Sequence, residues 1–234
     1  MRLLAGLFAL AAPLFAVAAT AQVPAAPRAP VPSATDPQNL WVLDLSTGGR
    51  VTIWLRPDVA PKMVERIKTL TRQHFYDGLS FHRVIEGFMA QGGDPKGDGT
   101  GGSALPDMPA EFNYLPHVRG AVSAARADKE DSANSQFFIV FQPKLNLDKK
   151  YTVFGRVIDG MQWVDAVERG EPPTNPSRIV HAYVLADNPP AFVDMPTMPA
   201  PAMTPAMLPT GPAVAAPRRA PVKAAPRKAP AARR

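Results

Sequence analysis

The sequence predicts a mainly β domain in which a closed or nearly closed antiparallel sheet is accompanied by two helices. Eight short β-type segments and two segments of helical periodicity occupy the central part of the chain. The strands do not alternate with helices, which argues against the βαβ pattern of a parallel sheet. The central region of about 150 residues is long enough to build a full hydrophobic core.

The first two strands are predicted as a hairpin. Segments 41–45 and 51–55 alternate apolar and polar side chains, and Gly48 and Gly49 lie between them. A helix is predicted over 60–72, because Pro61 suits a first helical turn. Four apolar residues then follow at helical spacing: Met63, Val64, Ile67 and Leu70.

Six more strands and one more helix complete the predicted domain. The strands are expected over 80–85, 87–91, 121–125, 136–141, 152–157 and 179–185. The second helix is expected over 159–169, where Met161, Val164 and Val167 share one side and Gly170 follows as a C-terminal cap.

The N-terminal segment predicts export. Residues 3–18 are apolar behind Arg2, and Ala19-Thr20-Ala21 has the small-x-small pattern of a cleavage site. A membrane anchor is disfavoured because Pro13 interrupts a run that is already short for a bilayer. We therefore expect residues 1–21 to be a signal peptide and the protein to be exported, into a bacterial periplasm.

The flanking segments have a different composition from the domain. Residues 22–39 and 187–234 are rich in Pro and Ala, and the last 48 residues hold 12 of the 28 prolines. We expect a linker and a tail, both extended and disordered, on either side of a domain spanning 40–186.

The net charge of +6 comes from these ends, since seven Lys and Arg residues lie in the tail. The middle of the chain is close to neutral, so nucleic-acid binding is not expected there. The tail could instead make weak electrostatic contact with an anionic envelope. We expect a monomer.

Several kinds of site are excluded or disfavoured. The chain has no cysteine, which removes disulfides, a thiolate nucleophile and cysteine-based metal sites. Residues 97–102 satisfy G-x-G-x-x-G, but residues 103–109 cannot continue as the required helix. Residues 94–99 resemble a calcium loop, yet Lys96 occupies a ligand position. Both are predicted to be glycine-rich surface loop, with no metal and no cofactor.

The four histidines are also not expected to bind metal. His82 and His117 are predicted to be hydrogen-bonded structural residues. His74 and His181 show no metal-ligand spacing with them.

Two segments combine charged or amide side chains with large apolar ones. They are FHRVIEGFMAQGGD at 81–94 and SANSQFFI at 132–139. With Asp77-Gly78 before the first segment and VFGRV at 153–157 after the second, the chain resembles the cyclophilin family of peptidyl-prolyl cis/trans isomerases over about residues 40–186.

The resemblance implies an eight-stranded closed antiparallel β-barrel capped by two helices, with a groove that binds X-Pro peptides. It implies that Arg83 is the catalytic residue. The residues it implies for substrate binding are Phe88, Met89, Gln91, Ala125, Arg126, Gln136, Phe138, Leu147 and Tyr151. Phe81, Ile85, Phe137 and Ile139 are expected on the opposite, core-facing side of their strands.

The chemistry of X-Pro rotation suits these residue types. Twisting the amide destroys its resonance and leaves a lone pair on the proline nitrogen, to which an arginine N–H can donate. The reaction needs no nucleophile, metal or cofactor. A peptide-binding holdase with little turnover is the alternative, although the presence of Arg83 argues against it. A third possibility is a cell-envelope tether in which the basic tail is the functional part.

Two positions depart from the best-known eukaryotic members. Asn146 stands where they have tryptophan, and Tyr151 where they have histidine. Neither residue supplies the donor, so isomerase activity is expected to survive. Cyclosporin binding is expected to be weak, because an indole wall and its N–H are lost.

Overall fold

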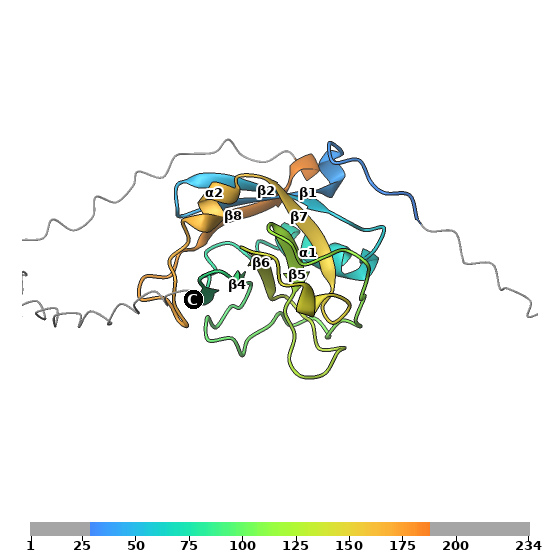
Figure 1. The fold of residues 1–234 in the computed structure, drawn as a ribbon. Helices are drawn as coiled ribbons and strands as arrows, with labels where there is room; N and C mark the ends of the chain where they lie inside the picture. The colour runs from blue at the N-terminus through green and yellow to red at the C-terminus, as the bar shows by residue number, and fades with distance from the viewer. Residues whose placement is uncertain (1–28, 188–234) are drawn as a thin grey trace, which may run out of the picture. The chain divides into compact units, whose positions relative to one another are not determined.

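The computed structural model describes residues 29–187 (Figure 1). The predicted signal peptide and residues 188–234 of the predicted tail lie outside the described residues. The strands are β1 (Leu40–Leu45), β2 (Gly49–Leu55), β3 (Arg83–Ile85), β4 (Met89–Gly92), β5 (Ala121–Ala124), β6 (Phe137–Val140), β7 (Val153–Asp159) and β8 (Ile179–Val184). The helices are α1 (Pro61–Arg72) and α2 (Met161–Asp165), with short 3-10 helices η1 (Pro37–Asn39), η2 (Leu145–Leu147) and η3 (Leu185–Asp187).

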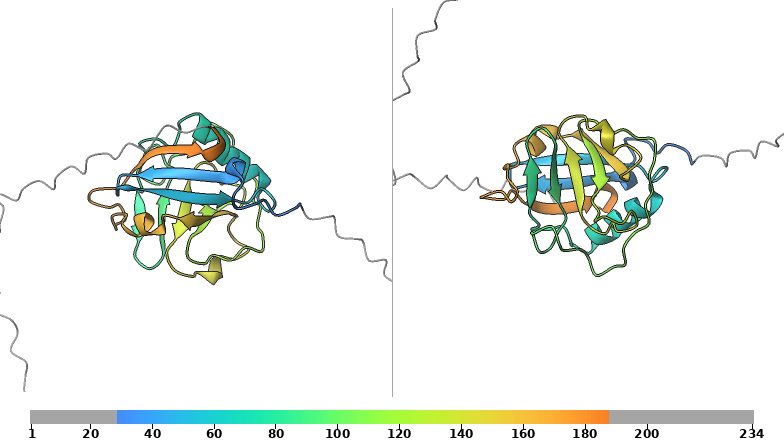
Figure 2. Two further views of the ribbon diagram at one scale, coloured as in Figure 1. Left: turned by 90° about the horizontal axis from the view of Figure 1, so that it is seen from above. Right: turned by 60° about the horizontal axis from the view of Figure 1, so that its bottom comes forward.

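The eight strands form one antiparallel sheet in the order β3-β4-β6-β5-β7-β2-β1-β8. In Figure 2 the half that contains β4, β6 and β5 lies across the half that contains β8, β1 and β2, so the sheet curls over on itself. The mainly β class is confirmed, and each of the eight predicted strands is present, although the ends differ from the predicted ones by up to three residues, most of all at the start of β3.

The two ends of the sheet meet through a short seam rather than through a ladder between β3 and β8. The backbone N–H of Gly78 donates to Ile179 O at 2.7 Å, Ile179 N–H donates to Leu79 O at 2.9 Å, and Phe81 N–H donates to Ser177 O at 2.9 Å. The sheet is therefore curled, and no β3–β8 ladder closes it. Its two edges are joined instead by hydrogen bonds between the segment before β3 and residues 177–179, where β8 begins.

The core lies between the two halves of the sheet and α1. Trp41 is fully buried and meets the rings of Tyr76 and Phe137 edge-on, with centroids 5.3 and 5.0 Å away. The four predicted apolar residues of α1 are all buried against this core. Helix α1 lacks a side-chain cap of its own, and the Glu111 carboxylate instead accepts the N–H groups of Lys62 and Met63 at 3.1 and 2.9 Å. A carboxylate suits this helix end because it faces unpaired N–H groups and the positive end of the dipole.

The second helix is shorter than the predicted 159–169, which is wrong at both ends. Strand β7 continues to Asp159, and Gly160 turns the chain with φ +80° before α2 begins. After Asp165 the backbone leaves the helix because it finds partners elsewhere. Glu168 N–H donates to the Ser177 hydroxyl at 3.1 Å, and Gly170 pairs with Val84 beside β3.

The folded part extends slightly beyond both predicted boundaries. Residues 37–39, assigned to the linker, form η1, which Asp36 caps by accepting Gln38 N–H at 3.0 Å. Asn39 is buried and accepts from Lys68 of α1. At the other end, Asp187 pairs with Arg72 at 2.8 Å. These contacts explain why the fold begins before residue 40 and includes Asp187.

No helix within residues 29–187 combines the length and the apolar character needed to cross a bilayer. The segment after Asp94 is irregular, as predicted, and no helix follows its glycines. Asp94 is buried and organises this loop by accepting the N–H groups of Lys96, Asp98 and Gly99 at 2.6–3.1 Å.

Candidate active site

A cavity of about 390 Å³ opens on the side of the sheet where β3, β4 and β6 lie together. It brings together nine of the ten site residues predicted from the sequence and adds Asn146. The nine are Arg83, Phe88, Met89, Gln91, Ala125, Arg126, Phe138, Leu147 and Tyr151. Its volume falls within the ordinary range for a ligand pocket.

Arg83 stands at this cavity because of strand register. It lies directly opposite Gln91 in the β3–β4 ladder, so both side chains leave the sheet on the same face. The guanidinium Nε donates to Glu171 Oε2 at 2.7 Å, and Nη1 lies 3.5 Å from Gln91 Oε1. With 42% of its side chain exposed, Arg83 keeps N–H groups accessible to a ligand.

Gln136 is the one predicted residue outside the cavity lining, but it is joined to it. Gln91 donates from Nε2 to Gln136 Oε1 at 2.9 Å, and Gln136 donates to the carbonyls of Gly99 and Gly101 at 3.0 and 2.7 Å. Gln136 lines a neighbouring, more polar cavity of about 410 Å³ that shares Gln91, Ala125 and Arg126 with the first. A continuous polar chain thus runs from Arg83 to the 99–101 loop.

The remaining wall of the cavity is apolar. Met89 and Phe138 are buried on the cavity side of β4 and β6, and Phe88, Leu147 and Tyr151 pack against them. Phe138 meets Tyr151 edge-on at 5.8 Å and stacks on His117 at 6.1 Å. Because Met89 and Phe138 are buried within strands, they give this wall a fixed base against which the half-buried side chains pack.

Side-chain alternation separates the cavity from the core, with one correction. Phe81, Phe137 and Ile139 lie in the core, as predicted. The prediction for Ile85 is wrong, because Ile85 packs with the cavity-side cluster of Met89 and Phe138. It lies two positions after Arg83 in β3 and so shares the face of Arg83.

The two histidines predicted to be hydrogen-bonded, His82 and His117, differ in the structure. His117 is fully buried and its ring nitrogens contact Asp148 at 2.8 Å and Ser123 at 3.2 Å, as predicted. Burial lowers the pKa of His117 and the Asp148 hydrogen bond opposes this. His82 is buried too, but neither ring nitrogen has a hydrogen-bond partner among the described residues, so these residues supply none of the hydrogen bonds predicted for it. Burial is the main cause that lowers the pKa of His82.

Ala125 and Arg126 lie at the end of β5. Ala125 N–H donates to Gln136 O at 3.0 Å, which extends the sheet by one pair beyond β5. The Arg126 guanidinium lies 4.7 Å from the centre of the Tyr151 ring and donates to the carbonyls of Ala127 and Asp128. Arg126 therefore holds a loop at the cavity edge through its hydrogen bonds to backbone carbonyls. Arg83 is the arginine that lies between the polar chain and the apolar wall.

Glu171 was not found from the sequence. It is 88 positions from Arg83 and belongs to a Pro-rich loop that carries no motif. The one signal that points to such a residue is general: an arginine held in a groove needs an acidic partner, which does not say which Asp or Glu supplies it. The cavity lining contains no histidine, carboxylate or thiol, so it offers no ordinary metal-ligand set.

Comparison with known proteins gives a consistent result. The family model "Cyclophilin type peptidyl-prolyl cis-trans isomerase/CLD" matches residues 42–184. A Brucella suis protein named "Probable peptidyl-prolyl cis-trans isomerase" is 47% identical over 171 residues, covering 66% of this chain and 87% of that protein. Peptidyl-prolyl cis-trans isomerase B of Bacillus subtilis is 42% identical over 128 residues, covering 54% of this chain and 89% of that protein.

Solved structures agree with these relatives. The crystal structure of a cyclophilin from Hirschia baltica superimposes with a TM-score of 0.61 at 30% identity, covering 66% of this chain and 77% of that one. A Cryptosporidium parvum cyclophilin-type isomerase, crystallised in the presence of the dipeptide Ala-Pro, superimposes with a TM-score of 0.58 at 27% identity, covering 62% of this chain and 98% of that one.

Proposed function

The chain belongs to the cyclophilin-type peptidyl-prolyl cis-trans isomerases, and from this premise we propose that the 390 Å³ cavity is its isomerase site and that Arg83 stabilises the twisted X-Pro bond. The observation that carries the proposal is the position of one accessible guanidinium between a polar chain and an apolar wall. The substrates are proline-containing polypeptides.

Arginine is the group that the reaction needs. The barrier to rotation is about 18–20 kcal/mol because the planar amide loses its resonance when it twists. In the twisted state the proline nitrogen becomes pyramidal and gains a lone pair that the planar form lacks. An N–H of Arg83 that donates to this nitrogen therefore stabilises the transition state more than the ground state, which is the condition for catalysis.

The apolar wall holds the part of the substrate that must not move. Met89, Phe138 and Leu147 offer a rigid surface to the pyrrolidine ring, and rotation then occurs on the N-terminal side of the bond. Gln91 and Gln136 present amide groups along the peptide path, and their mutual hydrogen bond fixes both side chains. Ala125 and Arg126 offer backbone at the edge where an extended peptide would lie.

The site of action is part of the proposal. We place the substrates among exported proteins in a bacterial periplasm, because residues 1–21 have the pattern of a cleavable signal peptide. Expression of the full gene in a Gram-negative host, cell fractionation and mass spectrometry of the intact protein test this. A periplasmic species that begins at Gln22 supports it, and a cytoplasmic species that keeps residues 1–21 contradicts it.

A protease-free assay tests the function. NMR exchange spectroscopy on a peptide with one Ala-Pro bond measures cis/trans exchange and binding in the same sample. We expect catalytic acceleration together with shifts of the Phe138 and Leu147 signals. Binding without acceleration would favour a holdase, and acceleration without shifts at the cavity would contradict the site assignment.

A further inference from the structure

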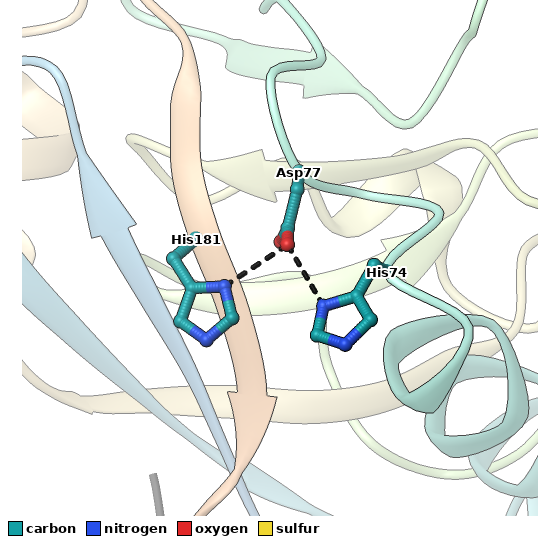
Figure 3. Close-up of side chains that lie close together, drawn as sticks. All are labelled: His74, Asp77 and His181. Atoms are coloured by element: carbon teal, nitrogen blue, oxygen red, sulfur yellow. Dashed lines mark hydrogen bonds and ion pairs between the residues drawn. The ribbon is translucent and has the colours of Figure 1, made fainter. Parts of the chain in front are cut away.

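The side chains of His74, Asp77 and His181 lie close together (Figure 3), and none of them lines the proposed isomerase cavity. His74 follows α1, Asp77 lies in the loop before β3, and His181 belongs to β8. In Figure 3 both imidazole rings approach the same carboxylate from opposite sides. The fold thus brings together three side chains of the types that bind transition metals.

We propose that His74, Asp77 and His181 bind a divalent transition-metal ion of the zinc class. The Nδ1 atoms of both histidines lie 3.0 Å from the same atom, Asp77 Oδ2, and one ligand atom from each residue lies within 4.8 Å of the others. Zinc bonds to nitrogen and oxygen are near 2.0–2.1 Å, so ligand atoms of a tetrahedral site are roughly 3.3 Å apart. Small side-chain adjustments would bring these atoms around one ion.

The donor set selects the class of metal. Two imidazole nitrogens and one carboxylate oxygen suit Zn²⁺, Co²⁺, Ni²⁺ or Cu²⁺, whereas Ca²⁺ and Mg²⁺ prefer sets made of oxygen alone. Three protein ligands leave a fourth position for water.

The carboxylate is already held in place. Asp77 Oδ1 accepts the N–H of Ala182 at 2.8 Å, which orients Oδ2 toward the two rings. Such an outer hydrogen bond is what metal-binding carboxylates commonly have. The Nδ1 contacts to Asp77 would be exchanged for bonds to the ion, and each neutral imidazole would then carry its single ring proton on Nε2, because a metal binds the unprotonated nitrogen.

The cluster is open enough for an ion to enter. The His74 side chain is 70% exposed, while those of Asp77 and His181 are 26% and 23% exposed. The two inner ligands are therefore held by the fold, and His74 can swing onto an ion from outside. The rings of His74 and His181 are already nearly parallel, with centroids 5.8 Å apart.

The position of the cluster indicates what the ion would do. Asp77 directly precedes Gly78, whose N–H donates to Ile179 O at the seam where the two ends of the sheet meet. An ion on these ligands would link the loop before β3 to β8 across that seam. We therefore expect it to stabilise the fold without taking part in X-Pro rotation.

The alternative is a purely hydrogen-bonded cluster, in which both histidines donate to Asp77 and bind no ion. Cobalt distinguishes the two, because the visible absorption of Co²⁺ reports its ligands directly. The full-length protein, prepared without a polyhistidine tag, is titrated with Co²⁺ by absorption and with Zn²⁺ by calorimetry. We expect one ion per chain.

The variants make the assignment specific. His74→Asn and His181→Asn should each weaken binding at least tenfold, and the double variant should abolish the cobalt spectrum. Glu168→Gln removes an exposed carboxylate outside the cluster and should bind like the unmodified protein. Absence of stoichiometric binding, or equal binding by the double variant, would overturn the proposal.

Thermal unfolding supplies a second readout that does not depend on isomerase activity. Zn²⁺ should raise the Tm of the unmodified protein and of Arg83→Ala alike, but not that of the double histidine variant. A zinc-induced rise in Tm that persists in the double variant would place the ion elsewhere and overturn the assignment to these residues.

Discussion

Arg83 and Glu171 form an ion pair of 2.7 Å beside the proposed isomerase cavity, although 88 positions separate them in the sequence. Backbone hydrogen bonds between the adjacent residues hold the two side chains near each other. Val84 N–H donates to Gly170 O at 2.8 Å and Gly170 N–H donates back to Val84 O at 2.9 Å. These two bonds place the neighbours of Val84 and Gly170, which are Arg83 and Glu171, next to each other. We therefore infer that Glu171 is a positioning residue for the guanidinium.

Glu171→Ala should lower kcat/KM by up to about fivefold, because exposed ion pairs contribute at most about 1 kcal/mol. Glu171→Gln should recover most of the loss, since its amide oxygen can still accept from Nε. The measurement is protease-free NMR exchange at low salt.

Glu86→Ala is the matched control. Glu86 pairs with Arg169, which lies on the same loop as Glu171, and it does not pair with Arg83. If Glu86→Ala and Glu171→Ala lower kcat/KM equally, the loop matters as a whole and the positioning role of Glu171 is lost.

Much of the fold was predictable because local patterns agree with tertiary structure. Strand β2 alternates buried and half-buried side chains as its sequence predicts, although β1 is buried throughout, and α1 has both a starting proline and a single apolar stripe. Helix α2 was overestimated because its end depends on Ser177 and Val84, which no local pattern reveals. Tertiary partners decided that boundary.

The site divides in the same way. The residues in two contiguous motifs were found, whereas Glu171 and the His74–Asp77–His181 cluster arise only through folding, with Asp77 and His181 104 positions apart. Ile85 shows a different cause. Ile85 lies two positions after Arg83 in β3, so its side chain is on the same face as that of Arg83. Phe81 precedes the strand, and the alternation within β3 therefore does not extend to it.

Acid should destabilise the protein through its buried histidines. Burial lowers the pKa of His82, and that of His117, in the folded state. In the unfolded chain a histidine titrates near pH 6.5, so below that pH the unfolded state binds more protons and the free energy of unfolding falls.

His82→Leu should remove one such contribution. When the pH is lowered from 7.5 to 5.5, the free energy of unfolding should fall by up to about 1.4 kcal/mol more for the unmodified protein than for the variant. Urea unfolding at the two pH values measures this difference. An equal loss in both proteins would show that protonation of His82 is not coupled to unfolding.

Cyclosporin should inhibit this protein only weakly. Asn146 lies in η2 and lines the cavity, where it offers neither the flat apolar surface nor the indole N–H of tryptophan. Asn146→Trp should strengthen inhibition at least tenfold, with a smaller effect on kcat/KM.

Asn146→Phe separates the two contributions, since it restores an aromatic ring without the N–H. Inhibition constants from the exchange assay decide the matter, and tight inhibition of the unmodified protein would contradict the prediction.

The C-terminal segment should act through charge and not through catalysis. Deletion of residues 188–234 should leave kcat/KM unchanged but reduce binding to anionic vesicles at low ionic strength, because seven Lys and Arg residues are lost. Binding by the full-length protein should weaken as salt is added.

A full-length variant with these seven residues changed to Gln controls for chain length. Vesicle co-sedimentation is the measurement. If the full-length, truncated and neutralised proteins bind equally at low salt, the envelope-contact idea fails while the isomerase assignment stands.

The most direct test of the account is the kcat/KM of Arg83→Ala in the protease-free exchange assay. Arg83 lies on a surface groove and outside the core, so its loss should leave the urea unfolding midpoint nearly unchanged. Removing a donor that acts mainly in the transition state should lower kcat/KM by about 100-fold or more. A folded Arg83→Ala protein whose kcat/KM stays within threefold of the unmodified enzyme would contradict the central claim.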